Sequence, residues 1–304
     1  MAGLVYLLVL HIVISAVGIA GNLLLLGSLM RLPRLKTYEI FLLGLASTNL
    51  EEIVVVDVYD VVVLQLSQMR LVNVWWCRTL KFLTVLGEIG SISFTVLISV
   101  FRYQKLRDAE RRVSRPIRMD DRRVAYALCG GSLLLALALA TPTYVTNLDG
   151  HLVNLSQPGG CPPDFFQCHP DNCPLLNRLY KYLFIVLVNL LPLLVVSYSS
   201  GLILRVLLRQ HRAVQARLAT QGHVGSRSGR TTFRFRNSTV TILVAMVVFQ
   251  VNWSLYLVLH LASSPYSFHA WSEVEFFITT SYTTISPYVY GIGSDLFAIR
   301  SCKG

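Results

Sequence analysis

The residues with the most distinctive chemistry in this sequence are charged side chains that stand inside long apolar stretches. Glu88 is the one charged residue in the segment 82–101, and Lys81 precedes it by seven residues. In a helix that spacing puts the two side chains on the same face, two turns apart. A second group of acids interrupts the apolar segment 41–66 and consists of Glu51, Glu52, Asp57 and Asp60. Carboxylates in such surroundings need a partner, which a ligand, a cation or an internal polar network can provide.

Motifs for catalysis or for metal binding are missing from the sequence. It contains no His-Glu-x-x-His, no Gly-x-Ser-x-Gly and no Walker lysine loop. An enzyme of the membrane interior would need a catalytic pair of aspartates, and no such pair occurs in a suitable helical context. Apart from the adjacent Cys168 and His169, no histidine pairs with a cysteine at zinc-finger spacing. We therefore expect neither an enzyme nor a metal or other cofactor.

The composition favours lipid rather than water as the solvent of this chain. Of its 304 residues, 54% are hydrophobic and 14% are charged, whereas soluble domains carry about 25% charged residues. The net charge of +11 would suit nucleic acid, but the basic residues lie between apolar stretches and not along one amphipathic face. We therefore expect an integral membrane protein that does not bind nucleic acid.

Seven apolar segments are long enough to cross a membrane. A hydrocarbon core about 30 Å thick requires about 20 helical residues. The expected spans are 4–30, 38–66, 78–102, 122–145, 178–208, 236–262 and 272–293. The second is the least apolar, and we retain it because its omission would break the alternation of charge described next. The sequence thus predicts an all-α seven-helix bundle that forms one domain, residues 1–304.

Basic residues are concentrated in alternate connecting segments. The segments 31–37, 102–123, 205–237 and 294–304 hold 22 of the 27 Lys and Arg residues. Because positive charge stays cytoplasmic, the N-terminus is expected outside and the C-terminus inside. The segment 146–176 then becomes an extracellular loop, and 209–235 becomes a basic cytoplasmic loop that should be largely flexible in isolation.

Two features of the expected extracellular side agree with this orientation. Asn154 begins a glycosylation triplet, whereas the triplets at Asn237 and Asn252 would be inaccessible to the modifying enzyme. The cysteines expected on this oxidising side allow two disulfides in three connectivities, and they are Cys77, Cys161, Cys168 and Cys173.

Several spaced motifs resemble those of rhodopsin-like, class A G-protein-coupled receptors. Cys77 lies at the head of the third span, 25 residues before Arg102, as in that family. The other matching positions are Gly21 and Asn22, Phe101 to Tyr103, Pro192, Phe249 and Trp253, and Ser286 to Tyr290. The resemblance implies a disulfide from Cys77 to one of Cys161, Cys168 and Cys173, and an amphipathic eighth helix over residues 294–301. It also implies that activation involves Arg102, Tyr103, Phe249, Trp253, Pro287 and Tyr290.

Departures from the class A pattern point to a subfamily. The acid of the sodium-linked site is replaced by Asn49, and the acid of Asp-Arg-Tyr is replaced by Phe101. The proline of Trp-x-Pro is replaced by Leu255, and the asparagine of Asn-Pro-x-x-Tyr is replaced by Ser286. With these changes the chain is similar to vomeronasal type-1 receptors and their fish olfactory relatives. The resemblance implies a plasma-membrane receptor of sensory neurons, coupled to an inhibitory heterotrimeric G protein. Its ligand would be steroid- or bile-acid-like, or a small aromatic acid.

We expect a ligand site in the outer half of the bundle, where polar groups converge on an apolar interior. Its expected lining is Asp60, Lys81, Thr84, Glu88, Asn189, Trp253, Tyr256, His260 and Thr280. Both signs of charge are present, so an acid could bind at Lys81 or a base at Glu88. Two alternatives remain at this point. The acids from Glu51 to Asp60, with Glu88, could form the ion or proton path of a transporter or channel, and Trp253 and Arg102 could be an ordinary core aromatic and an ordinary cytoplasmic cation.

Overall fold

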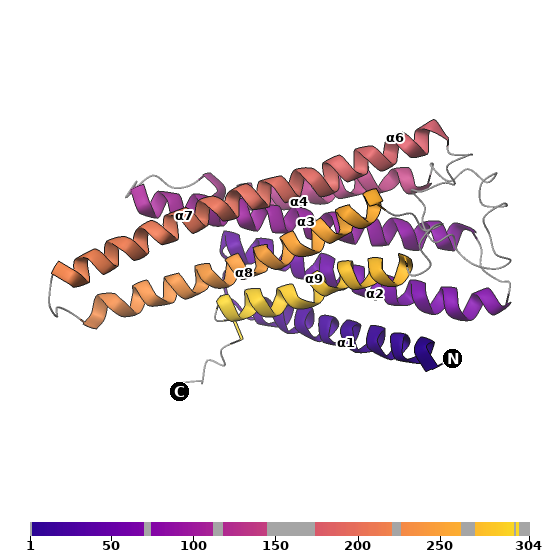
Figure 1. The fold of residues 1–304 in the computed structure, drawn as a ribbon, viewed down its shortest axis with the longest axis horizontal. Helices are drawn as coiled ribbons and strands as arrows, with labels where there is room; N and C mark the ends of the chain where they lie inside the picture. Colours follow the sequence, from indigo (N-terminus) through magenta and orange to yellow (C-terminus); the bar gives the residue numbers. More distant parts are fainter. Residues whose placement is uncertain are drawn as a thin grey trace.

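The computed structural model describes residues 2–69, 74–111, 118–144, 174–220, 226–262, 271–294, 296 and 297. Apart from short turns these residues are helical, and no strand occurs among them. The long helices lie side by side along one axis (Figure 1). They are α1 (Ala2–Met30), α2 (Thr37–Met69), α3 (Val74–Arg111), α4 (Arg122–Ala140), α6 (Leu175–Phe184), α7 (Leu191–Thr220), α8 (Ser226–Ala262) and α9 (Trp271–Gly293).

The helices α6 and α7 form one continuous rod, so the bundle has seven rods in the described part of the chain. A π-helical segment, η4 (Ile185–Leu190), joins them, and the Leu191 amide donates to the Val186 carbonyl five residues earlier. Pro192 supplies the physical reason, because it has no N–H to donate to the Val188 carbonyl four residues earlier. The sequence predicted this span without its π-helical segment.

Side-chain caps fix where two of the helices begin. At the start of α2 the Glu39 carboxylate accepts a hydrogen bond of 2.7 Å from the Lys36 amide. At the start of α4 the Asp121 side chain accepts one of 3.0 Å from the Arg123 amide. Such caps satisfy backbone donors that have no partner within the helix.

The rods alternate in direction, and α3 lies at the centre of the bundle, in contact with α2, α4 and α7. The helix α1 packs against α2 and α9, and α8 packs against α9 and α7. We call the end at which α1 and α9 begin the outer end, and the opposite end the inner end. The N-terminus lies at the outer end and the last described residues lie towards the inner end (Figure 1).

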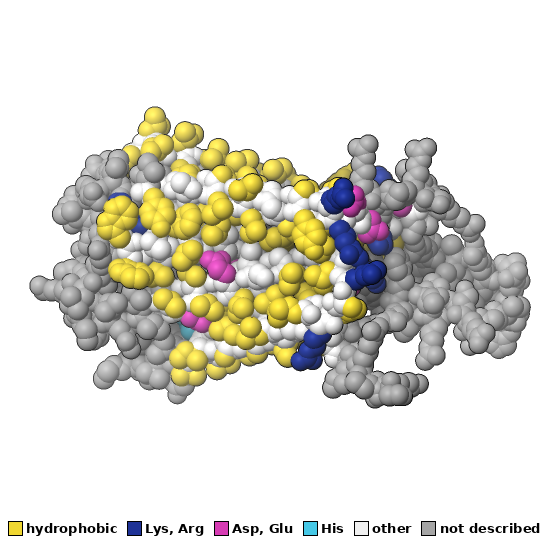
Figure 2. Space-filling view, turned by 180° about the vertical axis from the view of Figure 1, so that it is seen from behind, with side chains coloured by type: hydrophobic (Ala, Val, Ile, Leu, Met, Phe, Trp, Pro, Cys, Tyr) yellow, Lys and Arg dark blue, Asp and Glu magenta, His cyan; other side chains and the backbone are white. Residues whose placement is uncertain are grey.

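The outside of the bundle is apolar, as a membrane-spanning protein requires. The described part of α4 buries three small residues, Ala125, Ala136 and Ala140, while Leu134 and its neighbours are exposed. Figure 2 shows apolar side chains over the face in view and Lys and Arg side chains gathered mainly at one end. A patch of this size would be unstable in water, so lipid must cover it.

Five helices within the described ranges are long and apolar enough to cross a membrane by length and composition. They contain Val9–Met30, Arg78–Asp108, Arg122–Tyr144, Leu175–Arg209 and Val240–Ala262. The helices α2 and α9 complete the bundle although they carry more polar residues. Their polar side chains face other helices, as Asn49 of α2 and Ser286 of α9 illustrate, both fully or almost fully buried.

The structure differs from expectation at the inner end. The segment 209–235 was expected to be a loop, but its described part is helical, because α7 continues to Thr220 and α8 begins at Ser226. Its arginines and alanines are good helix formers, and they extend the helices beyond the apolar spans. The expected eighth helix, 294–301, lies mostly outside the described residues, and Ser294, Leu296 and Phe297 are not helical.

Candidate functional site

Glu88 is the centre of a polar cluster towards the outer end of the bundle. Its side chain is 5% exposed and is a hydrogen-bonding partner of Tyr256 on α8. Lys81, two turns nearer the outer end on the same face of α3, and Glu275 of α9 are close enough to act on it electrostatically. Tyr180 of α6 is also within electrostatic range of Glu88. We call these residues, with His260, the outer cluster; they come from four of the rods.

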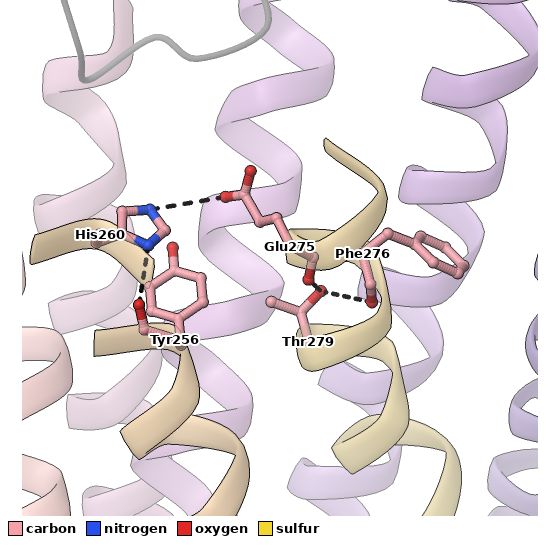
Figure 3. A network of polar contacts seen from close by, with 5 residues as sticks. All are labelled: Tyr256, His260, Glu275, Phe276 and Thr279. Atoms are coloured by element: carbon pink, nitrogen blue, oxygen red, sulfur yellow. Dashed lines mark hydrogen bonds and ion pairs between the residues drawn. The ribbon is translucent and has the colours of Figure 1, made fainter. Parts of the chain in front are cut away.

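Within the outer cluster, His260 of α8 contacts Glu275 of α9. Its Nε2 atom lies 3.8 Å from a carboxylate oxygen of Glu275, and its Nδ1 atom lies 3.1 Å from the Tyr256 carbonyl oxygen. Figure 3 shows His260 of α8 facing Glu275 of α9, with the ring of Tyr256 beside it. The imidazole stacks on Tyr256, with ring centroids 4.0 Å apart. The hydroxyl of Thr279, one turn after Glu275, donates hydrogen bonds to the backbone carbonyl oxygens of Glu275 and Phe276 in its own helix.

A continuous column of rings leads from the outer cluster into the bundle. It consists of Phe249, Trp253, Tyr256 and His260 of α8, and we call it the aromatic ladder. Neighbouring ring centroids are 6.0, 5.1 and 4.0 Å apart. At its inner end Phe249 makes an edge contact with Tyr282 of α9, with centroids 5.4 Å apart. Residues three or four apart share one helix face, so the ladder follows from the sequence spacing.

The centre of the bundle is held together by direct hydrogen bonds among three helices. The Asn49 amide donates to the Ser286 hydroxyl at 3.0 Å and accepts from the Ser91 hydroxyl at 2.7 Å. One turn further along α3, the hydroxyls of Thr95 and Tyr282 are 2.6 Å apart. Asn49, Ser91, Thr95 and Ser286 are all buried. This network ties α2, α3 and α9 together, and its members are Asn49 and hydroxyl residues rather than Glu51 and Glu52.

Arg102 lies near the inner end of α3 and is covered by an aromatic ring. Its guanidinium carbon is 3.6 Å from the ring centroid of Tyr38, at the start of α2. The side chains of Tyr38 and Arg102 are also within electrostatic range of Tyr290, which is fully buried. The acid that would pair with the arginine in the class A motif is replaced by Phe101, which is buried against Phe41. A cation–π contact therefore takes the place of an ion pair.

Further carboxylates are paired along α1. The Ser15 hydroxyl donates to Asp57 at 2.6 Å, and His11 lies 3.1 Å from Glu273 and stacks on Phe276. Asn22 donates to the Gly18 and Thr283 carbonyl oxygens, which fastens α1 to α9. Asp57 is thus a bonded group between two helices.

The other expected ligand residues are distributed over α2, α3, η4 and α9. Thr84 bonds the Leu80 carbonyl within its own helix, and Thr280 is buried on α9. Asn189, on the π-helical segment, is 2% exposed, and neither its amide oxygen nor its amide nitrogen has a partner among the described residues. The side chains of Asp60 and Cys77 lie outside the described part, as do Asn154, Cys161, Cys168 and Cys173.

Three members of these arrangements were not predicted from the sequence. Glu275 and Tyr180 belong to the outer cluster, and Tyr38 covers Arg102. His260 lies near the end of α8 and Glu275 near the start of α9, and consecutive antiparallel helices bring such positions together; this was the available signal. Tyr38 gives no comparable signal, because its contact depends on how α2 is rotated against α3.

The comparison with known proteins gives one finding for the whole bundle. The family model of the 7 transmembrane receptor (rhodopsin family) matches residues 21–290. No curated protein matches the chain. The matched segment runs from the first helix to Tyr290 and so includes the outer cluster, the aromatic ladder and Arg102.

Proposed function

Because this chain belongs to the rhodopsin family of seven-transmembrane receptors, we propose that it is a chemosensory receptor. It binds a small organic ligand in the outer half of the bundle and activates a heterotrimeric G protein at the inner end. Class A receptors are multi-pass membrane proteins and not enzymes. We propose that the whole chain forms one receptor domain.

The observation that carries this proposal is the aromatic ladder between two polar regions. At one end His260 and Tyr256 join the outer cluster, and at the other Phe249 packs on Tyr282, which bonds Thr95. A ligand that displaces Tyr256 must shift Trp253, because buried rings in contact cannot move independently in a densely packed interior. Ligand binding would thus favour one of two packings of α8 against α9.

The inner end supports an exchange of partners at Arg102. In the described arrangement its guanidinium lies on Tyr38 and its Nε atom has no hydrogen-bond partner among the residues described. An inner-end movement of α8 would open space beside α3, and Arg102 could then leave the ring for a G-protein group. Tyr103, Pro287 and Tyr290 are the other residues we assign to this step. The inhibitory class of G protein is proposed from the subfamily resemblance.

The chemosensory role rests on the subfamily motifs. Asn49 and Ser286, which depart from the usual class A residues, bond each other directly, so the departures occur together in one structural unit. We propose the plasma membrane of sensory neurons as the location, with Asn154 glycosylated and Cys77 bonded to one of the three loop cysteines. Steroid- or bile-acid-like molecules and small aromatic acids are ligand candidates by resemblance, and the outer cluster supports a further candidate class below.

A G-protein activation assay in cells that express the chain tests this function. Bile acids, steroids, small aromatic acids and amines form the panel, and inhibition of cyclic AMP formation is the readout. Arg102→Ala should lower the maximal response at least about tenfold, since the loss of a charged contact costs more than 1.4 kcal/mol. Arg31→Ala removes an exposed arginine just after the inner end of α1; it is the matched control and should respond as the native chain does.

Two results would contradict the proposal. A response that survives Arg102→Ala at full size would remove that residue from signalling. Ligand-dependent currents in cells without G proteins would instead favour an ion path along Glu51, Glu52, Asp57, Asp60 and Glu88. The bonding of Asp57 to Ser15 gives that path no support, since a conducting group should face its neighbouring carboxylates.

A further inference from the structure

We infer that the ligand carries an ammonium group and that Glu88 receives it, in an aromatic surrounding formed by Tyr180, Trp253 and Tyr256. This inference rests on the proposed receptor function and adds the charge class of the ligand. It decides between an acid at Lys81 and a base at Glu88, which the sequence left open.

Several carboxyl groups lie close together around Glu88. Glu275 acts on Glu88 from α9, and Glu52 of α2 lies within electrostatic range of both Glu88 and Glu51. Lys81 is the single Lys or Arg that acts on Glu88 in the described part of the chain, and His260 can add a second positive charge only when protonated. The carboxyl groups of Glu51, Glu52, Glu88 and Glu275 thus form a chain of interacting acids, with Lys81 and His260 as basic neighbours. Burying acids together in this way is costly unless they gain a partner.

Gly87 lets two of these acids come this close. A methyl group at Gly87 would collide with the Glu51 carboxylate and with the Cα and Cβ atoms of Glu52. The absence of a side chain at this position therefore lets the acidic face of α2 pack directly beside the turn of α3 that bears Glu88. The closeness of these acids is a built feature of the α2–α3 contact.

Unused hydrogen-bonding atoms point to a missing partner. The Oε1 atom of Glu88 and the Oε2 atom of Glu52 are buried and have no hydrogen-bond partner within the described ranges. The indole N–H of Trp253 is likewise without an acceptor there, and its residue is 4% exposed. Since buried polar groups are nearly always bonded, these atoms mark where a ligand or water completes the structure. Acceptors on carboxylates call for a donor, and an ammonium group supplies donors and positive charge together.

Aromatic residues lie beside the same carboxylate, directly or through a neighbouring ring. Tyr256 hydrogen-bonds Glu88, Trp253 makes an edge contact with Tyr256, and Tyr180 is within electrostatic range. The faces of tyrosine and tryptophan rings attract organic cations. A carboxylate ligand would instead add a further acid beside Glu88, where Lys81 and a protonated His260 would have to offset it. The site thus discriminates against anions.

Matched sets of ligands test this inference on the full-length receptor. Phenylethyl, octyl and steroid scaffolds are each presented as the primary amine, the alcohol and the carboxylic acid, with G-protein activation as the readout. We expect at least one amine to activate the receptor, with its alcohol and acid counterparts at least about 30-fold less potent, as the loss of a buried charge pair implies. Silence of every amine, or an acid as potent as its amine, overturns the inference.

Substitutions at Glu88 identify the partner of the amine. Glu88→Gln should lower amine potency at least about 30-fold, to the level of the alcohol. Glu88→Asp should lower potency less and keep the amine as the best of each set. Glu39→Gln, an acid at the inner start of α2 that caps its own helix, is the matched control and should change nothing. Amine potency unchanged in both Glu88 variants overturns the inference, with surface expression measured throughout.

Failure here is separable from failure of the receptor function. If the chain activates a G protein without ligand, and Arg102→Ala abolishes this activation, then the receptor works. In that case a lack of response to every amine refutes the ammonium inference alone. Absence of both ligand-free coupling and any ligand response refutes the receptor function as well.

Discussion

Arg102 and Tyr38 show how one altered residue changes the partner of the arginine in a class A motif. A guanidinium beside an acid at position 101 would be held by an ion pair, but Phe101 turns into the core and contacts Phe41. The ring of Tyr38 takes over at 3.6 Å from the guanidinium carbon. A contact of this kind is worth about 0.5–2 kcal/mol, less than a well-formed buried ion pair. The resting arrangement should therefore be easy to disturb at Tyr38.

Tyr38→Leu should raise ligand-free signalling. The substitution keeps an apolar side chain but removes the ring face. The arrangement in which Arg102 of α3 packs on residue 38 of α2 therefore loses about 1 kcal/mol of stability relative to the active arrangement. That shift corresponds to roughly a fivefold change in the ratio of the two states. Cyclic AMP measured without ligand checks it, and Tyr38→Phe serves as the control because it retains the ring. Equal basal signals from the leucine and phenylalanine variants, at equal surface levels, would refute a role for the ring.

At this scale the sequence indicated Phe249, Trp253, Tyr256 and His260 as activation or ligand residues but did not predict that they form one column. Their spacing of three and four residues places them on one helix face, and the structure brings their rings into contact in that order. Contacts between helices were largely missed. Tyr38 on Arg102 depends on helix rotation, which local spacing does not encode.

Among the elements, α2 and α3 share the most extensive contact between helices in the described part of the chain. Gly87 and Gly90 of α3 face Glu52 and Thr48 of α2, and Gly44 of α2 faces Phe94 of α3. Small residues allow helices to approach closely within a membrane, where lipid offers no hydrophobic driving force for association. The approach also aligns Asn49 with Ser91, which bond at 2.7 Å. Close packing and central hydrogen bonding are therefore one feature.

Gly87→Ala should destabilise the receptor, although alanine is the better helix former. The added methyl group would meet the Glu52 backbone, which cannot move aside as a side chain tip can, and overpacking of this kind costs about 1–3 kcal/mol. Thermal unfolding of the purified protein in detergent measures the loss. Gly131→Ala on α4, where nothing lies within 4 Å, should be neutral or stabilising by up to about 1 kcal/mol. A Gly87 variant as stable as the Gly131 variant would contradict the close contact.

Elements were predicted well where apolar length decides them and poorly where it does not. Seven apolar segments correspond to the seven rods in the described chain, including α2 with its acids. The π-helical turn was missed, since Pro192 alone does not specify how the helix accommodates it. The helical ends of α7 and α8 were missed because polar composition was taken to indicate a loop, whereas arginine and alanine continue a helix once it has begun.

At the scale of the whole molecule, charge and apolar surface together define an orientation. Exposed inner-end residues such as Arg31, Arg34, Lys36 and Lys105 border the apolar surface, and Figure 2 shows such side chains gathered mainly at one end. Because cytoplasmic segments retain Lys and Arg, that end faces the cytoplasm. Under the proposed function, the outer cluster then lies in the half of the bundle nearer the external medium, and Arg102 lies near the side from which a G protein would bind.

Glycosylation tests this orientation directly. If the N-terminal end is outside, Asn154 is in the lumen during synthesis and receives a glycan, whereas Asn237 is cytoplasmic and does not. Asn154→Gln should therefore increase the electrophoretic mobility of the protein from mammalian cells, and glycosidase treatment should remove the difference from the native chain. Asn237→Gln should leave the mobility unchanged. A shift confined to Asn237→Gln would invert the bundle, and would place the Glu88 cluster on the cytoplasmic side and Arg102 out of reach of any G protein.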